Sequence, residues 1–255
     1  MSKKRVLILV PARFASTRFP GKPLAMIKNK SMIARVMENM QKAQSENYEF
    51  VSCAVTDDQR IEDHLKEQKI KVVRVDDDVN SGTLRIELAY SRYFKSENFD
   101  LIVNVQGDEP LLQYEEIVDL AKFHLESKFD ITTLVKKNMG FTNEFFDTNK
   151  VKAVVSEKTR QALYFSRSSI PYKRDNSADP VNDYWLLHIG VYSYRPSALN
   201  LFANATASRL EELEKLEQLR AMELGLTIGA LETKSLIMGV DNPEDIKKVE
   251  EVICE

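Results

Sequence analysis

The first half of the sequence alternates short apolar runs with amphipathic segments, and this alternation restricts the possible folds more than any other feature. The runs are rich in valine and isoleucine, and the amphipathic segments carry apolar residues at helical spacing. Such repetition predicts a parallel sheet with helices on both faces, so the expected fold class is α/β. The expected strands cover residues 6–10, 50–55, 70–75 and 101–105, and the expected helices cover 32–40, 83–94, 115–125 and a segment capped by Asp57.

The second half has a different pattern, in which apolar runs are separated by loops and predict a more antiparallel arrangement. The runs occupy residues 131–135, 151–155, 162–165 and 187–194. One charged helix is expected over 209–224, with a leucine at every third position over 210–219, and residues 173–184 are expected to form a loop. We expect a single domain over residues 1–255, to which residues ~130–195 contribute an inserted antiparallel lobe.

The scarcity of glycine excludes several common nucleotide-binding motifs. Only 8 of the 255 residues are glycine, and no two of them have the Gly-x-Gly spacing. A dinucleotide fingerprint, a kinase glycine loop and a Walker A loop are therefore absent from the sequence. Three histidines and two cysteines do not build a Cys/His zinc site, and neither His-Glu-x-x-His nor Gly-x-Ser-x-Gly occurs.

The charge balance and the apolar runs give no reason to expect a nucleic-acid or membrane partner, and the two cysteines indicate a cytoplasmic protein. There are 36 basic and 39 acidic residues, so no excess of positive charge favours nucleic acid or an anionic membrane as a partner. The apolar run at 6–10 is shorter than the roughly 7–15 residues of a signal peptide core, and no stretch reaches the ~20 apolar residues of a membrane span. The two cysteines are expected to be reduced thiols.

A cluster of cations follows the first expected strand. Arg13, Arg18 and Lys22 lie within ten residues, in a loop that begins with Pro11 and Ala12 and contains further small residues. In parallel α/β sheets ligands bind outside the carboxyl ends of the strands. Cationic side chains and closely approaching backbone N–H groups in this loop therefore predict a polyphosphate site, whereas the alternative is a basic surface loop.

Acidic residues follow two other expected strands. Asp108 comes after the fourth strand, and a carboxylate there suits Mg²⁺, which takes one or two carboxylates together with substrate phosphates. Asp241 is a second acid in a turn before the last helix, although it could instead cap that helix. The run from Asp76 to Asp78 has the form of the metal motif of glycosyltransferases, but it is also typical of a solvated loop. Ser81 and Gly82 open a helix and could hold a base edge or an anion.

Taken together and in this order along the chain, these segments resemble the 3-deoxy-manno-octulosonate (Kdo) cytidylyltransferases, the CMP-Kdo synthetases. The resemblance covers almost the whole chain. It rests on Pro11-Ala12-Arg13, Pro20-Gly21-Lys22-Pro23-Leu24, Ala54-Val55-Thr56-Asp57-Asp58, Ser81-Gly82-Thr83, Val103-Asn104-Val105-Gln106-Gly107-Asp108-Glu109-Pro110, Ala162-Leu163-Tyr164-Phe165-Ser166-Arg167, His188-Ile189-Gly190-Val191-Tyr192, Leu216-Glu217-Gln218-Leu219-Arg220 and Gly239-Val240-Asp241.

The resemblance implies a Rossmann-like, three-layer nucleotide-diphosphosugar transferase fold and a definite reaction. The reaction is Mg²⁺-dependent transfer of CMP from CTP to the anomeric hydroxyl of Kdo, with release of pyrophosphate, for lipopolysaccharide synthesis by a homodimer. Arg13, Lys22 and Asp108 are the implied catalytic residues. The implied nucleotide contacts are Pro11, Ala12, Arg13, Arg18, Lys22, Ser81, Gly82 and Gln106, the implied metal ligands are Asp108 and Asp241, and the implied sugar contacts are Gln106, Arg167, His188, Glu217 and Gln218.

One position departs from the pattern of this family. The family usually has an acid between Ser-Gly-Thr and the following arginine, whereas Leu84 stands there in this chain. The departure leaves two alternatives open for the acceptor, namely the 8-amino analogue of Kdo or another ulosonic acid. A more distant alternative is a metal-dependent glycosyltransferase that uses Asp76 and Asp78. A nucleotide sensor without catalysis is a further one, against which Lys22 and both metal-binding acids argue.

Overall fold

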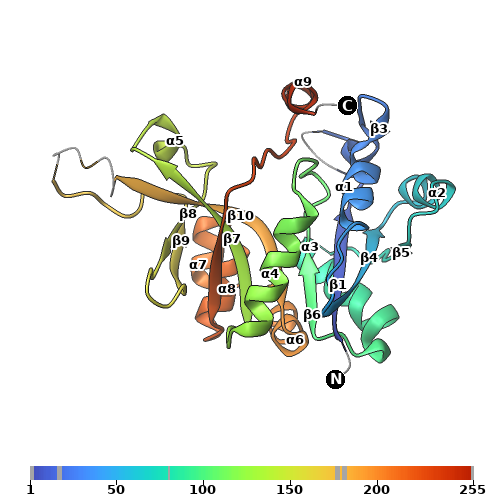
Figure 1. The fold of residues 1–255 in the computed structure, drawn as a ribbon, viewed down its shortest axis with the longest axis horizontal. Coiled ribbons are helices and arrows are strands. Elements are labelled where there is room, and N and C mark those ends of the chain that lie inside the picture. Colours follow the sequence, from blue (N-terminus) through green and yellow to red (C-terminus); the bar gives the residue numbers. More distant parts are fainter. Residues whose placement is uncertain (1–2, 16–18, 80, 176–178, 180–182, 254–255) are drawn as a thin grey trace. The chain divides into compact units, whose positions relative to one another are not determined.

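The chain forms two compact units, which we describe separately. The computed structural model describes residues 3–15, 19–79, 81–175, 179 and 183–253 (Figure 1). The first unit comprises Met1–Ala121 together with Ser235–Glu255, and the second comprises Lys122–Lys234. The predicted lobe at ~130–195 falls inside the second unit, and the prediction of one domain stays a prediction. Within the described ranges, no helix has the length and apolar character needed to cross a membrane.

The first unit is built on a parallel sheet, as the alternating pattern predicts. The strand order is β6-β1-β4-β5, and Val6 pairs with Phe50 on one side and with Leu101 on the other. Val6 to Val10 are fully buried because both faces of the central strand are covered. The strands are β1 (Lys4–Ala12), β4 (Tyr48–Thr56), β5 (Val72–Arg74) and β6 (Leu101–Asn104).

Side-chain caps fix where the helices of this unit begin. The Ser31 and Ser81 hydroxyls accept hydrogen bonds from the backbone N–H groups of Ala34 and Leu84. The second helix is capped by Asp58, so the prediction of Asp57 as its cap is wrong: the Asp57 side chain instead meets arginines. The helices are α1 (Met32–Met40), α2 (Gln59–Glu67), α3 (Gly82–Ala89), α4 (Tyr114–Glu126) and α9 (Pro243–Val252), and α4 runs across the boundary between the units.

Three short helices and one hairpin complete the described part of the first unit. They are the 3₁₀ helices η1 (Lys22–Leu24) and η3 (Lys95–Glu97), the π-helix η2 (Tyr90–Phe94), and the hairpin of β2 (Met26–Ile27) and β3 (Lys30–Ser31). The helix expected over 83–94 is therefore α until Ala89 and π beyond it.

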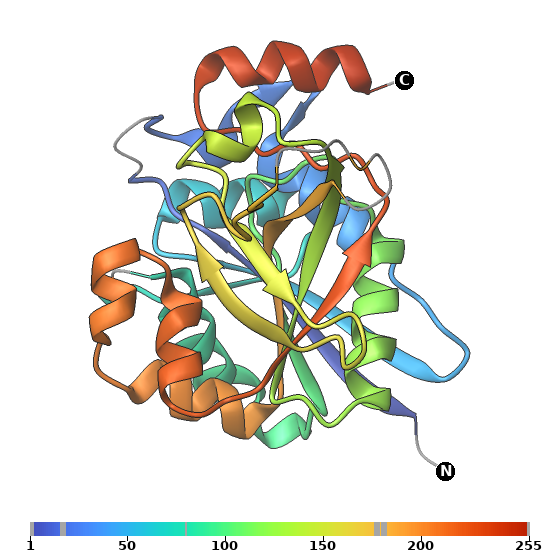
Figure 2. The same cartoon turned by 90° about the vertical axis from the view of Figure 1, so that its left-hand side faces the viewer.

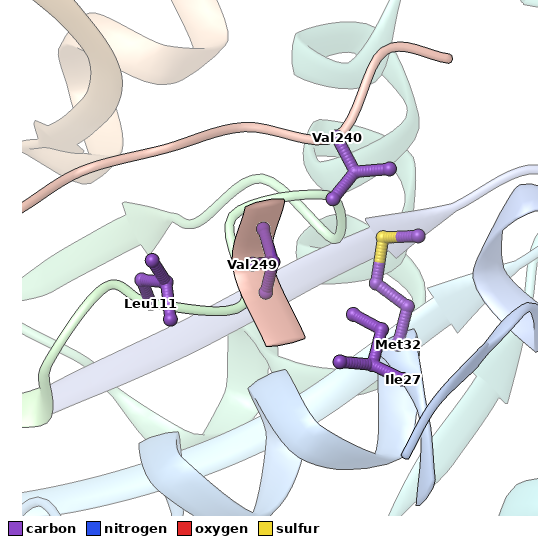
Figure 3. Packing of buried hydrophobic residues seen from close by; sticks show 5 residues of the cluster. All are labelled: Ile27, Met32, Leu111, Val240 and Val249. Atoms are coloured by element: carbon purple, nitrogen blue, oxygen red, sulfur yellow. The ribbon is translucent and has the colours of Figure 1, made fainter. Parts of the chain in front are cut away.

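An apolar cluster attaches the returning C-terminal segment to the rest of the first unit (Figure 3). Its members are Ile27, Met32, Leu111, Val240 and Val249, each at most 7% exposed. They come from β2, α1, the loop after β6, the segment before α9, and α9 itself. Burial of apolar side chains stabilises by roughly 1.5–3 kcal/mol each. The cluster thus fixes the segment that carries Asp241 beside the loop that carries Asp108.

The second unit has a mixed sheet (Figure 2). Strand β10 pairs antiparallel with β7 and with β8, β8 pairs antiparallel with β9, and β11 pairs parallel with β7. The predicted antiparallel character is confirmed for four strands, and β11 is a parallel strand that the sequence pattern did not reveal. The strands are β7 (Ile131–Met139), β8 (Lys152–Val155), β9 (Ala162–Ser166), β10 (Tyr184–Tyr194) and β11 (Ile228–Thr233), and the helices are α5 (Asn143–Phe146), α6 (Pro196–Asn204), α7 (Arg209–Glu214) and α8 (Glu217–Glu223).

The single helix predicted over 209–224 is wrong, because the chain breaks it into α7 and α8. Lys215 has a φ of 53°, in the left-handed region that ends a right-handed helix, and Leu216 is the extended residue that precedes α8. The break changes the direction of the leucine stripe. Leu216 and Leu219 are buried, whereas Leu213 is 66% exposed.

Two loops of the first unit approach each other so closely that one position requires glycine. A Cβ on Gly107 would lie 2.8 Å from the backbone oxygen of Pro11, and a backbone atom cannot move aside cheaply. Gly82 faces the same loop, but a Cβ there would lie 3.5 Å from the Pro11 ring, an ordinary contact. Gly107 therefore sets the spacing between the carboxyl ends of β1 and β6.

We expect Gly107→Ala to lower the free energy of unfolding by about 1–3 kcal/mol, the usual effect of overpacking. Gly82→Ala, the matched control, should change it by less than about 0.5 kcal/mol. Urea unfolding followed by circular dichroism measures both. Equal effects of the two substitutions would contradict this assignment.

The second unit contains a buried neutral histidine, His124. Its Nδ1 lies 2.8 Å from the Ser193 hydroxyl and its Nε2 lies 3.1 Å from the Phe129 carbonyl oxygen. These partners suit a neutral ring that donates from Nε2 and accepts at Nδ1. The pKa of His124 is lowered to about 4, mainly by burial, which outweighs the hydrogen bond to Phe129 that raises it; the nearby Arg195 contributes to the lowering.

Stability should therefore decrease as the pH falls from about 6.5 toward 4. In this window the unfolded chain binds a proton at His124 and the folded chain does not, so acid favours unfolding, by at most about 1.4 kcal/mol per pH unit. Chemical denaturation between pH 4.5 and 7 measures the slope, and His124→Gln should reduce it. An unchanged slope in His124→Gln would refute this assignment.

Candidate active site

The first unit has a pocket at the carboxyl ends of β1 and β6, where ligands bind in parallel α/β sheets. Its volume is about 250 Å³. This volume is below the 300–1,000 Å³ typical of pockets that enclose a ligand, so it accommodates part of a nucleotide. The lining residues are Pro11, Ala12, Arg13, Ala15, Lys22, Pro23, Gly82, Gln106, Gly107 and Asp108. The structure thus brings together seven of the residues predicted from the sequence to contact nucleotide or metal.

A larger cavity of the same unit contains none of the predicted residues. It has a volume of about 520 Å³ and is lined by α1, the loop after β6 and the C-terminal segment. Lys30, Arg35, Lys42 and Glu38 supply its charged groups. Size alone would select this cavity, whereas the chemistry of the lining residues selects the smaller one.

Lys22 links three segments that are far apart in the sequence. Its ammonium donates a hydrogen bond of 2.5 Å to Asp108 Oδ2 and one of 3.0 Å to the Val240 carbonyl oxygen. The Val240 backbone N–H in turn donates to the Asp108 carbonyl oxygen over 2.9 Å. Lys22 is only 16% exposed, whereas Asp108 is 34% exposed. Lys22 therefore holds the Asp108 carboxylate in place, and that carboxylate remains accessible to a ligand.

Glu109 joins Asp108 and Asp241 in an acidic cluster. Burial raises the pKa of Glu109 to about 8, the charges of Asp108 and Asp241 add to this shift, and Lys22 opposes it. Its Oε2 is buried without a hydrogen-bond partner in the part of the chain that the structure describes. Glu109 was not predicted as a site residue, although its place directly after Asp108 is a signal that could have indicated it. With this pKa Glu109 is mainly protonated at neutral pH, beside the carboxylates of Asp108 and Asp241.

This acidic cluster fits a hard divalent cation. Asp108 is accessible and Asp241 is exposed, and carboxylate oxygens are the ligands that Mg²⁺ prefers. Asp241 does not cap α9, because Asn242 and Asp245 form the capping box. Among the described residues no three His, Cys, Asp or Glu side chains form a ready metal site. Two protein carboxylates with remaining ligands from substrate phosphates is the usual arrangement for Mg²⁺.

Arg13 lies beside an ion pair that the sequence did not predict. Its Nε is 3.7 Å from Asp57 Oδ2, and the same oxygen lies 3.0 Å from Nη2 of Arg85. The predicted nucleotide contact Arg18 lies outside the described residues. Asp57 is thus a missed residue of the pocket surroundings, because sequence position alone made it a helix cap.

The remaining predicted nucleotide residues also have defined places. Ser81 Oγ accepts a hydrogen bond from the Leu84 N–H over 3.1 Å, so its hydroxyl hydrogen can still be donated to a ligand. The aspartates of the glycosyltransferase alternative lie elsewhere. Asp76 pairs with Arg74 and Asp77 with Arg92, each at 2.5 Å and on exposed side chains, which is typical of a solvated loop.

The predicted sugar contacts His188, Glu217 and Gln218 lie in the second unit. His188 Nε2 is 3.1 Å from the Thr133 hydroxyl, and the ring packs against Phe165 and Tyr192. Burial lowers the pKa of His188 to about 3, so the ring is neutral at physiological pH. Gln218 is 6% exposed, and its Nε2 has no hydrogen-bond partner in the described part of the chain.

Arg167, also in the second unit, is held by the polypeptide backbone. Its Nε donates to the Glu214 carbonyl oxygen over 2.7 Å, and its Nη1 donates to the Thr148 carbonyl oxygen over 3.0 Å. Its backbone N–H donates to the Glu214 carboxylate over 2.9 Å. These bonds fix the segment after β9 to the end of α7, and they occupy donors that an acidic sugar would otherwise receive.

Comparison with known proteins identifies the family of this chain. A family model described as cytidylyltransferase matches residues 7–228. A 3-deoxy-manno-octulosonate cytidylyltransferase of Parabacteroides distasonis is 39% identical, with 94% of each chain covered. An 8-amino-3,8-dideoxy-manno-octulosonate cytidylyltransferase of Shewanella frigidimarina is 41% identical over 96% of this chain and 97% of its own.

A solved structure gives the same result for the fold. The structure of a CMP:2-keto-3-deoxy-manno-octonic acid synthetase in complex with CTP superposes with a TM-score of 0.87, at 32% identity and with 98% of each chain covered. The predicted α/β transferase fold is thereby confirmed. The chain belongs to the cytidylyltransferase family of nucleotidyltransferases, in the group of the 3-deoxy-manno-octulosonate enzymes and their 8-amino relatives.

Proposed function

We propose that this chain transfers CMP from CTP to the anomeric hydroxyl of Kdo, in a Mg²⁺-dependent reaction that releases pyrophosphate. The observation that carries the proposal is the pocket in which Arg13, Lys22 and Asp108 meet at the ends of β1 and β6. It joins two cations suited to a triphosphate with an accessible carboxylate suited to a metal. Relatives of this chain are named for this substrate and for its 8-amino analogue.

Arg13 and Lys22 would bind the triphosphate. Attack of the sugar hydroxyl on the α-phosphorus breaks the bond to the β-phosphate bridging oxygen, and negative charge passes to the leaving pyrophosphate. Cations fixed beside these oxygens stabilise that charge without reorganising, which is the main source of catalysis in phosphoryl and nucleotidyl transfer. Lys22 is well placed because its ammonium is anchored to the Val240 carbonyl while it faces the pocket.

Asp108 and Asp241 would hold the Mg²⁺ ion. When bound, the ion would neutralise charge on phosphate oxygens and orient the reacting groups. Lys22, released from Asp108, would exchange this carboxylate for a phosphate oxygen. The ion pair therefore lets the positive charge of Lys22 and the negative charge of Asp108 compensate each other before the substrates bind.

Gln106 of the first unit and four residues of the second unit would bind the acceptor sugar. Gln218 is the best placed of the four, because a buried amide without a partner gains most from a hydrogen bond to a hydroxyl or carboxylate. His188 would offer a neutral ring, and Glu217, at the start of α8, would accept from sugar hydroxyls. Arg167 would act mainly by fixing the wall of the site, since its donors are used by carbonyl oxygens.

We further propose a homodimer in the cytoplasm that serves lipopolysaccharide synthesis. The second unit exposes several large apolar side chains that a second copy could cover. They include Phe146, Leu163, Tyr172 and Leu213, which are 55–86% exposed. Light scattering of the purified protein would test the dimer.

Pyrophosphate release should be fastest with Kdo when the purified protein is given CTP and Mg²⁺. A panel of Kdo, 8-amino-Kdo and sialic acid identifies the acceptor through coupled phosphate detection. Faster turnover with 8-amino-Kdo would show that the acceptor is this analogue and not Kdo, and the proposed type of reaction would stand. No pyrophosphate with any ulosonic acid would refute the proposal.

Asp108→Ala should lower the rate of pyrophosphate release by about 10²-fold or more, because it removes both a metal ligand and the partner of Lys22. Chelation by EDTA should abolish turnover in the unaltered protein, and added Mg²⁺ should restore it. Asp76→Ala, at an exposed residue paired with Arg74, is the matched control and should retain the activity. The opposite order of the two variants would support the glycosyltransferase alternative instead.

A further inference from the structure

Arg85 is a buried cation of α3 that forms an ion pair with the Asp57 carboxylate. Its side chain is 1% exposed. The guanidinium donates a hydrogen bond of 2.5 Å to the Val75 carbonyl oxygen, and its Nη2 lies 3.0 Å from Asp57 Oδ2. A buried arginine without a carboxylate partner would be strongly destabilising. Asp57 is therefore a structural partner of Arg85 in the first place.

The same Asp57 oxygen also faces Arg13, at the edge of the nucleotide pocket. The distance of 3.7 Å to Arg13 Nε is too long for a hydrogen bond, although the charges still attract. The Arg13 side chain is 38% exposed as a whole, although its Nε is buried and makes no hydrogen bond in the described part of the chain, whereas the Arg85 side chain is 1% exposed. The carboxylate is thus shared unequally, tightly with Arg85 and loosely with Arg13.

We propose that Arg85 is a positioning residue that limits the hold of Asp57 on Arg13, so that Arg13 is aligned beside the pocket yet can transfer to the triphosphate. The inference rests on the proposed function, in which Arg13 binds phosphate. Burial lowers the pKa of Arg85, Asp57 opposes this shift and Arg13 adds to it, which places the two guanidinium groups in repulsive range of each other.

The physical reason lies in what Asp57 would lose when Arg13 leaves. With Arg85 in place, the carboxylate keeps its closest cation and its 3.0 Å contact, so moving Arg13 breaks no strong bond. Without the Arg85 charge, Arg13 would be the remaining cation, among the residues that the structure describes, within 4 Å of a carboxylate that is only 22% exposed. Transfer of Arg13 to phosphate would then leave that carboxylate uncompensated, which opposes binding.

The test compares Arg85→Gln with Arg85→Lys. Glutamine keeps hydrogen-bond donors for Val75 and Asp57 but removes the charge, and lysine keeps the charge. We expect Arg85→Gln to raise the Kd and the KM for CTP about tenfold or more with a smaller change in kcat, and Arg85→Lys to stay within about threefold of the unaltered protein. Calorimetry and steady-state kinetics measure these constants, and thermal melting verifies that each variant is folded.

A second substitution separates this role from mere support of the fold. Adding Asp57→Asn to Arg85→Gln removes the carboxylate that would capture Arg13, so CTP binding should return to within about threefold. Asp58→Asn, which retains the cap of α2, is the matched control and should leave CTP binding unchanged. If the double variant binds CTP as weakly as Arg85→Gln, or if Arg85→Gln binds like the unaltered protein, the inference is wrong.

One variant keeps the test decisive if Arg85→Gln does not fold. Asp57→Asn keeps an amide oxygen that can accept a hydrogen bond from Arg85, and thermal melting verifies that the variant is folded at the assay temperature. Asp57→Asn should bind CTP at least as tightly as the unaltered protein, because the competing charge is gone. Binding weakened several-fold would show instead that Asp57 anchors Arg13, which overturns the inference. If the unaltered protein releases pyrophosphate but the variants do not behave as expected, only this inference is refuted. If the unaltered protein does not bind CTP, both the proposed function and this inference are refuted.

Discussion

The contact on which the site of the first unit depends is the ammonium of Lys22, with its hydrogen bonds to the Asp108 carboxylate and the Val240 carbonyl. The apolar cluster around Met32 supplies the buried area that holds the returning segment, but apolar contacts do not fix its register. The hydrogen bonds do, since each needs one donor and one acceptor at one distance. An apolar core and a polar link thus place the two proposed metal-binding acids beside one cation.

The cations of the pocket are compensated internally before a polyanion binds. Lys22 is paired with Asp108, and Arg13 lies near an Asp57 that Arg85 already neutralises. Binding of a triphosphate can then proceed by exchange of partners, in which each carboxylate left behind finds another cation. Such exchange avoids the penalty of an isolated charge at either end of the process. It also explains why carboxylates lie beside the cations of a pocket proposed to bind an anion.

The sequence was sufficient for the sheet of the first unit, because buried parallel strands are apolar on both faces and each is followed by a helix. The sequence also predicted the residues at the strand ends, because the apolar runs show where each buried strand stops. The prediction failed where a single residue decides between two local structures. Asp57 and Asp58 are equally good caps by type, and the choice depends on Arg85, which lies 28 positions away in the chain. Likewise Lys215 ends a helix although lysine favours helices, because burial of Leu216 and Leu219 turns the next segment inward.

The structure shows where Leu84, the residue that departs from the family pattern, lies in the fold. Leu84 is in α3 of the first unit, directly before Arg85, and its backbone N–H donates to the capping Ser81. An acid at this position would add negative charge next to the pair of Arg85 and Asp57. With leucine there, Asp57 is the carboxylate in contact with the buried guanidinium. The departure thus lies in the first unit, whereas the residues proposed to select the sugar, apart from Gln106, are in the second unit.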